Sequence, residues 1–123
     1  MPQENLEQLR AAHALEEGKK LRRRDVVRLP AMILNNGLLS AAAFALDDKR
    51  VEMRGAMEAT IRFLHKRQLT SGTNVLTLVE DLTSNMRDAF AVQRATDESL
   101  AYLSYLKRFA SKGKDEEDAE ERP

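Results

Sequence analysis

Apolar residues recur every three or four positions along most of this 123-residue chain, and this spacing gathers them on one face of an α-helix. Met53, Met57, Ile61 and Leu64 form one such stripe. The composition agrees, because Leu and Ala supply 33 residues whereas the β-branched Val and Ile supply only 8. Side chains branched at Cβ lose rotamer freedom in a helix and favour strands. The sequence therefore excludes a β-sandwich or β-barrel.

Breaks in the apolar pattern predict where each helix begins and ends. Gly18 should end a first helix over residues 4–17, and Asn35-Asn36-Gly37 should end a second over 19–36. Pro30 lies inside the second helix and predicts a kink or a restart there. Further helices are expected over 38–46, which is apolar all round and should be buried, over 51–67, and between 75 and 110. Either Thr83-Ser84 or Thr96-Asp97 could divide the last stretch. The prediction is a compact all-α bundle of about five or six helices over residues 1–112.

Charge is distributed unevenly along the chain, although the formal net charge is zero. Residues 111–123 carry a net charge of −3, which leaves +3 on the remaining 110 residues. We expect an acidic, disordered tail at 113–123 beyond a mildly basic body. Cysteine is absent, so disulfides and thiolate sites are excluded. With neither a signal-peptide pattern nor an apolar run long enough to span a bilayer, we expect a cytoplasmic protein without membrane contact.

A basic cluster over residues 19–28 is the strongest local feature of the sequence. In one continuous helix, Lys20, Arg24 and Arg28 would form a stripe that could follow nucleic-acid phosphates without reading bases. A solvated face, partly neutralised by Glu16, Glu17 or the acidic tail, is the competing interpretation. Lys107 and Arg108 near the end of the last helix would also suit the negative end of its dipole.

No catalytic, metal or cofactor site is predicted. His13 and His65 are the only histidines, and they lie in different predicted helices outside any metal-ligand motif. The acidic pairs Asp47-Asp48 and Glu80-Asp81 match neither a calcium loop nor a zinc motif. The four phenylalanines, Phe44 among them, are expected in the core, so base stacking on exposed aromatics is not predicted. The chain is therefore interpreted as a binding or assembly protein.

Two segments resemble a known family. Residues 29–38, followed by Ala43-Phe44, are similar to the "LPxxIxxxGLxxxxAF" core of the small helical subunit of the type III-B CRISPR effector, the Cmr complex. Residues 94–100, then Leu103-Ser104-Tyr105-Leu106-Lys107-Arg108-Phe109-Ala110, are similar to the closing "T..AL..L.WLKRFA" helix of that family, with Tyr105 in place of a common tryptophan. Together the segments cover about a third of the chain, in the same order.

The resemblance implies a non-catalytic subunit without cofactors, acting in antiviral defence. Several copies would stack beside a filament of backbone subunits, contact the large subunit, and line the path of the duplex between CRISPR RNA and target RNA. It implies RNA contacts from the cations and structural roles as kink, C-cap and core residues for a second set. The first set is Lys20, Arg24, Arg28, Lys107 and Arg108, and the second is Pro30, Asn36, Gly37 and Phe44.

Other functions stay open at the level of the sequence. A small DNA-binding regulator would use the basic helix, although a helix-turn-helix partner is not evident. A helical adaptor would bind a partner helix through the apolar stripe at 75–90. An enzyme that uses His13 or His65 ranks behind both. The opposite charges of tail and body also suggest that residues 115–121 compete weakly with RNA for the basic stripe.

Overall fold

The computed structural model describes residues 5–47, 51–84 and 88–111, and these fold into helices without a β-strand. Six of the segments have eight residues or more, which confirms the predicted all-α class, and one is a single turn of four residues. They are α1 (Leu6–Gly18), α2 (Arg23–Val26), α3 (Arg28–Asn36), α4 (Leu38–Ala45), α5 (Val51–Lys66), α6 (Val75–Leu82) and α7 (Ala89–Phe109). The predicted disordered tail at 113–123 lies outside the described residues.

The prediction of a helix over residues 19–36 is wrong for its first turn, and the observed helix is interrupted in the middle of this range. Residues 19–22 are not helical, and α2 begins only at Arg23. Pro30 has no N–H to donate to the Val26 carbonyl, so the hydrogen-bond ladder breaks and α3 restarts at Arg28. The restart expected from Pro30 is therefore confirmed. The predicted stop is also confirmed, because α3 ends at Asn36 and Gly37 follows with φ +90°.

Helix α4 is buried on one side only, which corrects the prediction that it is buried all round. Leu38, Ala41, Ala42 and Ala45 are buried against α3, α5 and α6. Phe44 lies off this face and is 39% exposed, so its assignment to the core is wrong. The contact face of α4 consists mostly of alanine, which lets α6 pack closely and leaves the larger Phe44 ring at the surface.

The later helices follow local sequence signals closely. Helix α5 buries the predicted stripe of Met53, Met57, Ile61 and Leu64. Asn74 caps α6, since its side-chain oxygen accepts a hydrogen bond of 2.9 Å from the Thr77 N–H. Helix α6 ends at Leu82, whereas α7 continues without a break through Thr96-Asp97. The open choice between two break points is thus decided in favour of Thr83-Ser84.

Aromatic burial differs from the prediction at three of the four phenylalanines. Phe63 is buried, but Phe90 and Phe109 are 75% and 37% exposed, and Phe44 is half-exposed as described above. Phe90 is the second residue of α7, in the first turn of that helix. Tyr102 takes the central place instead, fully buried and stacked on Phe63 with ring centroids 4.6 Å apart.

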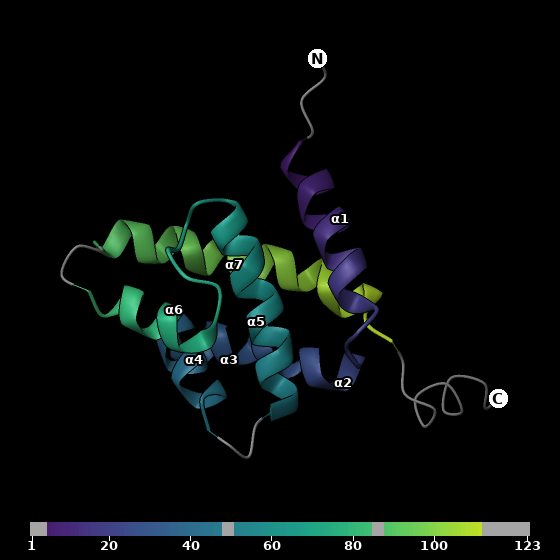
Figure 1. Cartoon of the computed structure of the whole chain (residues 1–123), viewed down its shortest axis with the longest axis horizontal. Helices are drawn as coiled ribbons and strands as arrows, with labels where there is room; N and C mark the ends of the chain where they lie inside the picture. Colours follow the sequence, from purple (N-terminus) through teal and green to yellow (C-terminus); the bar gives the residue numbers. More distant parts are fainter. Residues whose placement is uncertain (1–4, 48–50, 85–87, 112–123) are drawn as a thin grey trace.

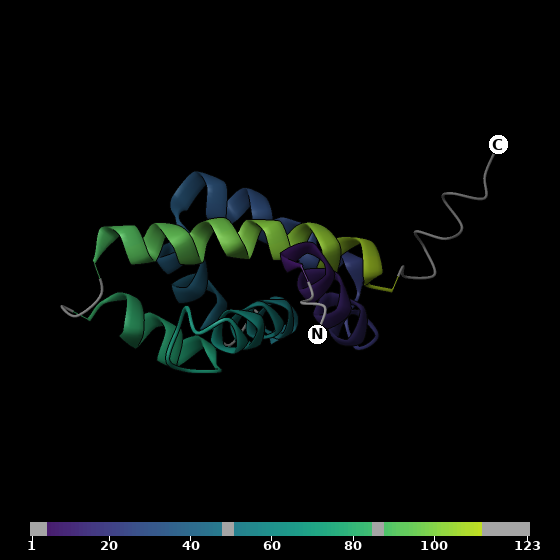
Figure 2. The same ribbon diagram turned by 90° about the horizontal axis from the view of Figure 1, so that it is seen from above.

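Helix α7 runs along the length of the molecule and organises the bundle (Figures 1 and 2). Helix α1 crosses its C-terminal part, and α2, α3 and α5 also pack on it. Helix α6 packs on α4 and α5. The largest fully buried side chains come from the six helices α2 to α7: Tyr102, Phe63, Leu29, Ile33, Leu38, Met57, Ile61, Leu64, Leu78, Leu103, Leu106 and Val26. Among the described residues, no helix is long and apolar enough to cross a membrane.

Candidate nucleic-acid interface

Backbone hydrogen bonds join the two predicted basic segments, which lie more than 80 residues apart in the sequence. The Ser111 N–H donates to the Leu21 carbonyl at 2.9 Å, and the Arg23 N–H donates to the Ser111 carbonyl at 2.8 Å. These bonds form an isolated parallel bridge between Arg22 and Ser111. They place the turn before α2 beside the C-terminal end of α7 (Figure 1). We call this region, with the cations of residues 19–24 and 107–108, the basic end.

The Arg23 side chain holds the two segments of the basic end together, so it is not one of the cations available to a ligand. Its Nε donates to the Lys107 carbonyl at 3.0 Å, and its Nη2 donates to the Arg108 carbonyl at 3.1 Å. These carbonyls belong to the last turn of α7, where helix carbonyls lack intrahelical partners and the dipole is negative. Arg23 therefore acts as a C-terminal cap supplied by another helix.

Gly18 allows the C-terminal end of α1 to lie close to the C-terminal end of α7. A Cβ atom built at Gly18 would lie 2.8 Å from both the carbonyl carbon and the carbonyl oxygen of Phe109. It would also lie 3.1 Å from the Ala110 nitrogen. Backbone atoms cannot turn aside as a side chain can. The C-terminal end of α1 thus touches the end of α7 only because residue 18 has no side chain.

The structure divides the predicted stripe of cations among three local environments. Lys20 lies in the turn before α2, so the single-helix stripe of Lys20, Arg24 and Arg28 is wrong. Arg24 lies in α2, and Arg28 is the first residue of α3. Val27 between these helices has helical backbone angles, so Arg24 and Arg28 still lie about one helical turn from each other.

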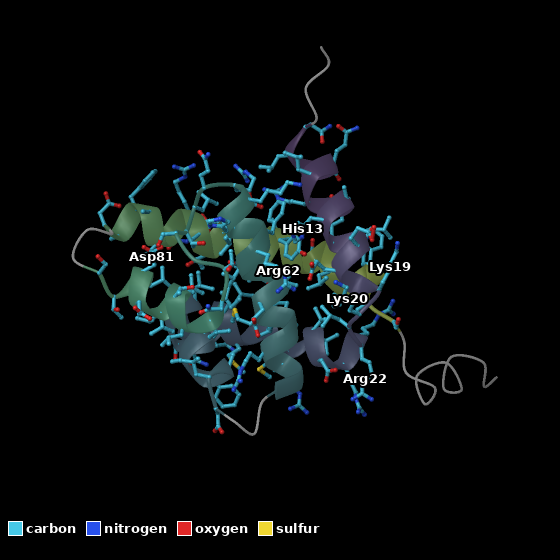
Figure 3. The ribbon with its side chains drawn as sticks, in the orientation of Figure 1. His13, Lys19, Lys20, Arg22, Arg62 and Asp81 are labelled. Carbon is cyan, nitrogen blue, oxygen red and sulfur yellow. The ribbon has the colours of Figure 1, made fainter. Side chains whose placement is uncertain are left out.

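All five predicted contact residues are exposed, and Lys107 and Arg108 join the group through the contacts of α2 with α7. Within the described part of the chain, none of the five has a carboxylate at ion-pair distance. Figure 3 shows Lys19, Lys20 and Arg22 together at the end where the chain leaves α7. The arrangement offers phosphate groups a set of accessible cations.

Two neighbouring cations have acidic partners of their own. Lys19 pairs with Glu16 at 3.0 Å, and Arg22 pairs with Asp25 at 3.5 Å. Both basic side chains are about half-exposed or more, so each pair contributes at most about 1 kcal/mol and is weakened by salt. Glu17, the other acid expected to neutralise this cluster, instead pairs with Arg62 of α5 at 2.5 Å.

A second group of charges holds α1 against α5 and α7. Glu98 is 5% exposed and accepts hydrogen bonds from Arg10 Nε at 2.5 Å and from the Arg67 guanidinium. Burial raises the pKa of Glu17, but the hydrogen bond and the charge of Arg62 outweigh it, and the net shift is downward. These pairs connect helices, so their first role is packing of the bundle.

The two histidines have separate structural environments. His13 Nδ1 and the Tyr102 hydroxyl are joined by a hydrogen bond of 2.7 Å, and the His13 ring packs edge-on to Phe63. Burial lowers the pKa of His13 below its ordinary value, with further lowering by Lys66 and Arg62 against the opposing charge of Glu17. His65 lies 3.3 Å from the Thr70 carbonyl at the end of α5. In the described ranges no group of three His, Cys, Asp or Glu side chains is placed to hold a metal ion.

Comparison with known proteins identifies one family. The family model described as "CRISPR-associated protein (Cas_Cmr5)" matches residues 6–112, which include every described helix and the whole basic end. No curated protein and no solved structure matches the chain.

Proposed function

Because the chain belongs to the Cas_Cmr5 family, the small subunits of type III-B CRISPR Cmr complexes, we propose that it is a non-catalytic RNA-holding subunit of such a complex. It would stack in several copies along the filament of backbone subunits, contact the large subunit, and help hold the duplex of CRISPR RNA and target RNA. Its place of action would be the cytoplasm, in antiviral defence.

The assembled basic end is the observation that carries this proposal. Cations from the turn before α2, from α2 and from the end of α7 meet there. Four of them, Lys20, Arg24, Lys107 and Arg108, are exposed and have no ion-pair partner among the described residues. Like charges gathered in this way repel one another, unless an anion covers them. The spread over several elements suits the phosphate backbone of an RNA duplex, which is contacted by shape and charge rather than by base edges.

Two of the other functions open at the level of the sequence have less support from the structure. Of the stripe proposed for an adaptor, Val75 and Leu82 are buried in the bundle and are not available to a partner helix. A DNA-binding regulator would need a recognition helix in the major groove, but α2 has only four residues. Contact between several exposed cations and phosphate groups needs neither an exposed apolar stripe nor a long recognition helix.

Charge reversal in the assembled complex tests the proposal. Arg24→Glu/Arg28→Glu should weaken retention of target RNA and flatten its dependence on salt, since each lost phosphate contact lowers the slope of log K against log salt by up to about 1. Arg94→Glu/Lys66→Glu changes the charge equally on other exposed cations. Arg94 precedes Arg108 by 14 residues on α7, about 21 Å along the helix axis. Equal RNA retention by the two double variants would remove Arg24 and Arg28 from the RNA path.

Incorporation into the complex is a separate measurement. The chain would be co-expressed with backbone subunits and a CRISPR RNA, and the assembly weighed by native mass spectrometry with and without target RNA. Several copies per complex, increased by target RNA, are expected. A filament that assembles while this chain remains free would contradict the proposed subunit role.

A further inference from the structure

The acidic segment of the chain begins in the middle of the basic end. Ser111 is held between Leu21 and Arg23 by backbone hydrogen bonds of 2.9 and 2.8 Å, so the chain beyond it starts from this surface. Residues 112–123 contain six carboxylates and three basic side chains. Four of the carboxylates are consecutive, from Asp115 to Asp118. We propose that this segment occupies the basic end of its own chain when RNA is absent, and acts as a built-in anionic competitor.

Charge complementarity on the surface supports this occupant. Lys20, Arg24, Lys107 and Arg108 are exposed and have no ion-pair partner among the described residues. Four cations thus face the start of a segment whose first acidic run also has four charges. The described acids nearest in sequence to Lys20 and Arg24 are already engaged, because Glu16 pairs with Lys19, Asp25 with Arg22, and Glu17 with Arg62. The six carboxylates of residues 112–123 are the next acids in the sequence after Lys107 and Arg108.

The reach of the segment is sufficient. Asp115 follows Ser111 by four residues, which span at most about 14 Å when extended. Arg108 precedes Ser111 by three residues, and Arg24 adjoins Arg23, whose N–H is bonded to the Ser111 carbonyl. A link this short gives an effective concentration of about millimolar, so weak pairs are occupied without a partner in solution.

The contact between the acidic segment and the basic end should be weak enough for RNA to displace the segment. Exposed ion pairs are individually weak and are screened within about 10 Å at 0.1 M salt. An RNA duplex presents more phosphates over a longer path, and it gains from the release of counterions. The competition itself rests on the proposed function, whereas the contact between the acidic segment and the basic end does not.

The contact is tested first, without RNA, on the full-length chain. Glu116→Gln/Glu117→Gln should shift the backbone amide NMR signals of residues 19–24 and 107–111, and 0.5 M NaCl should abolish the difference from wild type. Glu80→Gln/Asp97→Asn removes two exposed carboxylates from α6 and α7, the second about 15 Å along the helix axis from Lys107, and as the matched control should leave these signals unchanged. Unshifted signals in the first variant would overturn the contact. Shifts that grow with protein concentration would place the segment on a second copy and overturn the intramolecular proposal.

Competition is tested next, by fluorescence anisotropy with a labelled RNA duplex. At 50 mM salt Glu116→Gln/Glu117→Gln should bind about two- to fivefold more tightly than wild type, and the curves should converge at 0.5 M salt. Equal affinity at low salt, with the NMR shifts present, would overturn the competitor role and leave RNA binding intact. Absence of RNA binding by either protein, with the shifts present, would contradict the proposed function and the competition while the contact itself stands.

Discussion

A methyl group at Gly18 should separate α1 from the end of α7 and so disturb the basic end. The added Cβ would lie 2.8 Å from the carbonyl carbon and oxygen of Phe109, whereas ordinary contacts begin at 3.4 Å. The backbone must therefore move by about 0.6 Å. Two hydrogen bonds resist this movement, from Ser111 to the Leu21 carbonyl and from Arg23 to the Ser111 carbonyl.

The magnitude follows from two opposing contributions. Forcing one extra carbon into a packed contact costs about 1–3 kcal/mol. Replacing glycine by alanine in a helix returns at most about 1 kcal/mol, and less at the last residue of α1. We expect Gly18→Ala to lower the free energy of unfolding by about 1–2 kcal/mol. For a chain of this size, that corresponds to a fall in Tm of about 4–8 °C.

Thermal unfolding followed by circular dichroism measures this effect, with Gly55→Ala as the matched control. At Gly55 the nearest atom to an added Cβ is Leu21 Cδ2 at 3.3 Å, the end of a side chain that can turn aside. Gly55 lies inside α5, so alanine there should keep or raise Tm. A Tm of Gly18→Ala equal to that of wild type would refute the close backbone approach and, with it, the account of how the basic end is assembled.

Three further changes test other parts of the fold. Glu98→Gln leaves Arg10 and Arg67 without their shared carboxylate and should cost at most about 3 kcal/mol in urea unfolding, since both guanidinium groups are partly exposed. Folded His13 has a lowered pKa, so the unfolded chain binds the proton first and stability falls as pH drops below about 6.5; His13→Gln should flatten that slope in pH-dependent melting. Pro30→Ala restores an N–H at the junction of α2 and α3, and should raise the helical circular dichroism signal while changing stability by less than about 1 kcal/mol.

Helix ends were predictable because the signals that set them act within one turn. Gly37 needs φ +90°, Asn74 accepts from the Thr77 N–H, and Pro30 removes a donor, and each effect involves residues no more than four positions apart. The exposure of Phe44 and Phe90 was not predictable from such local signals. It depends on which face of α4 meets α6 and on how far α7 extends past its neighbours, and neither is encoded in local spacing.

The candidate interface was predictable in its parts but not in its assembly. The charges at residues 19–28 and at Lys107-Arg108 are evident in the sequence, yet no periodicity relates segments more than 80 residues apart. Nothing in the sequence distinguishes Arg23 from its neighbours in the run Arg22-Arg23-Arg24, although its side chain caps the C-terminal end of α7. Gly18 was correctly predicted to end α1, although it does so without a positive φ. Its second role, allowing the backbone of Phe109 to approach closely, was not predicted.

The charged side chains of this fold have two kinds of environment, and the difference supports the basic end as the surface proposed to contact RNA. Where α1 meets α5 and α7, Glu98 and Glu17 each have arginine partners, so those charges stabilise the packing of helices. At the basic end, Arg23 donates to carbonyls of α7, and Lys19 and Arg22 have exposed acidic partners, but Lys20, Arg24, Lys107 and Arg108 have no carboxylate partner among the described residues. A cluster that stabilised the isolated chain would have its carboxylates folded in among the helices. Here the surplus of acid instead follows Ser111 in the sequence, on the segment that we propose occupies the basic end when RNA is absent.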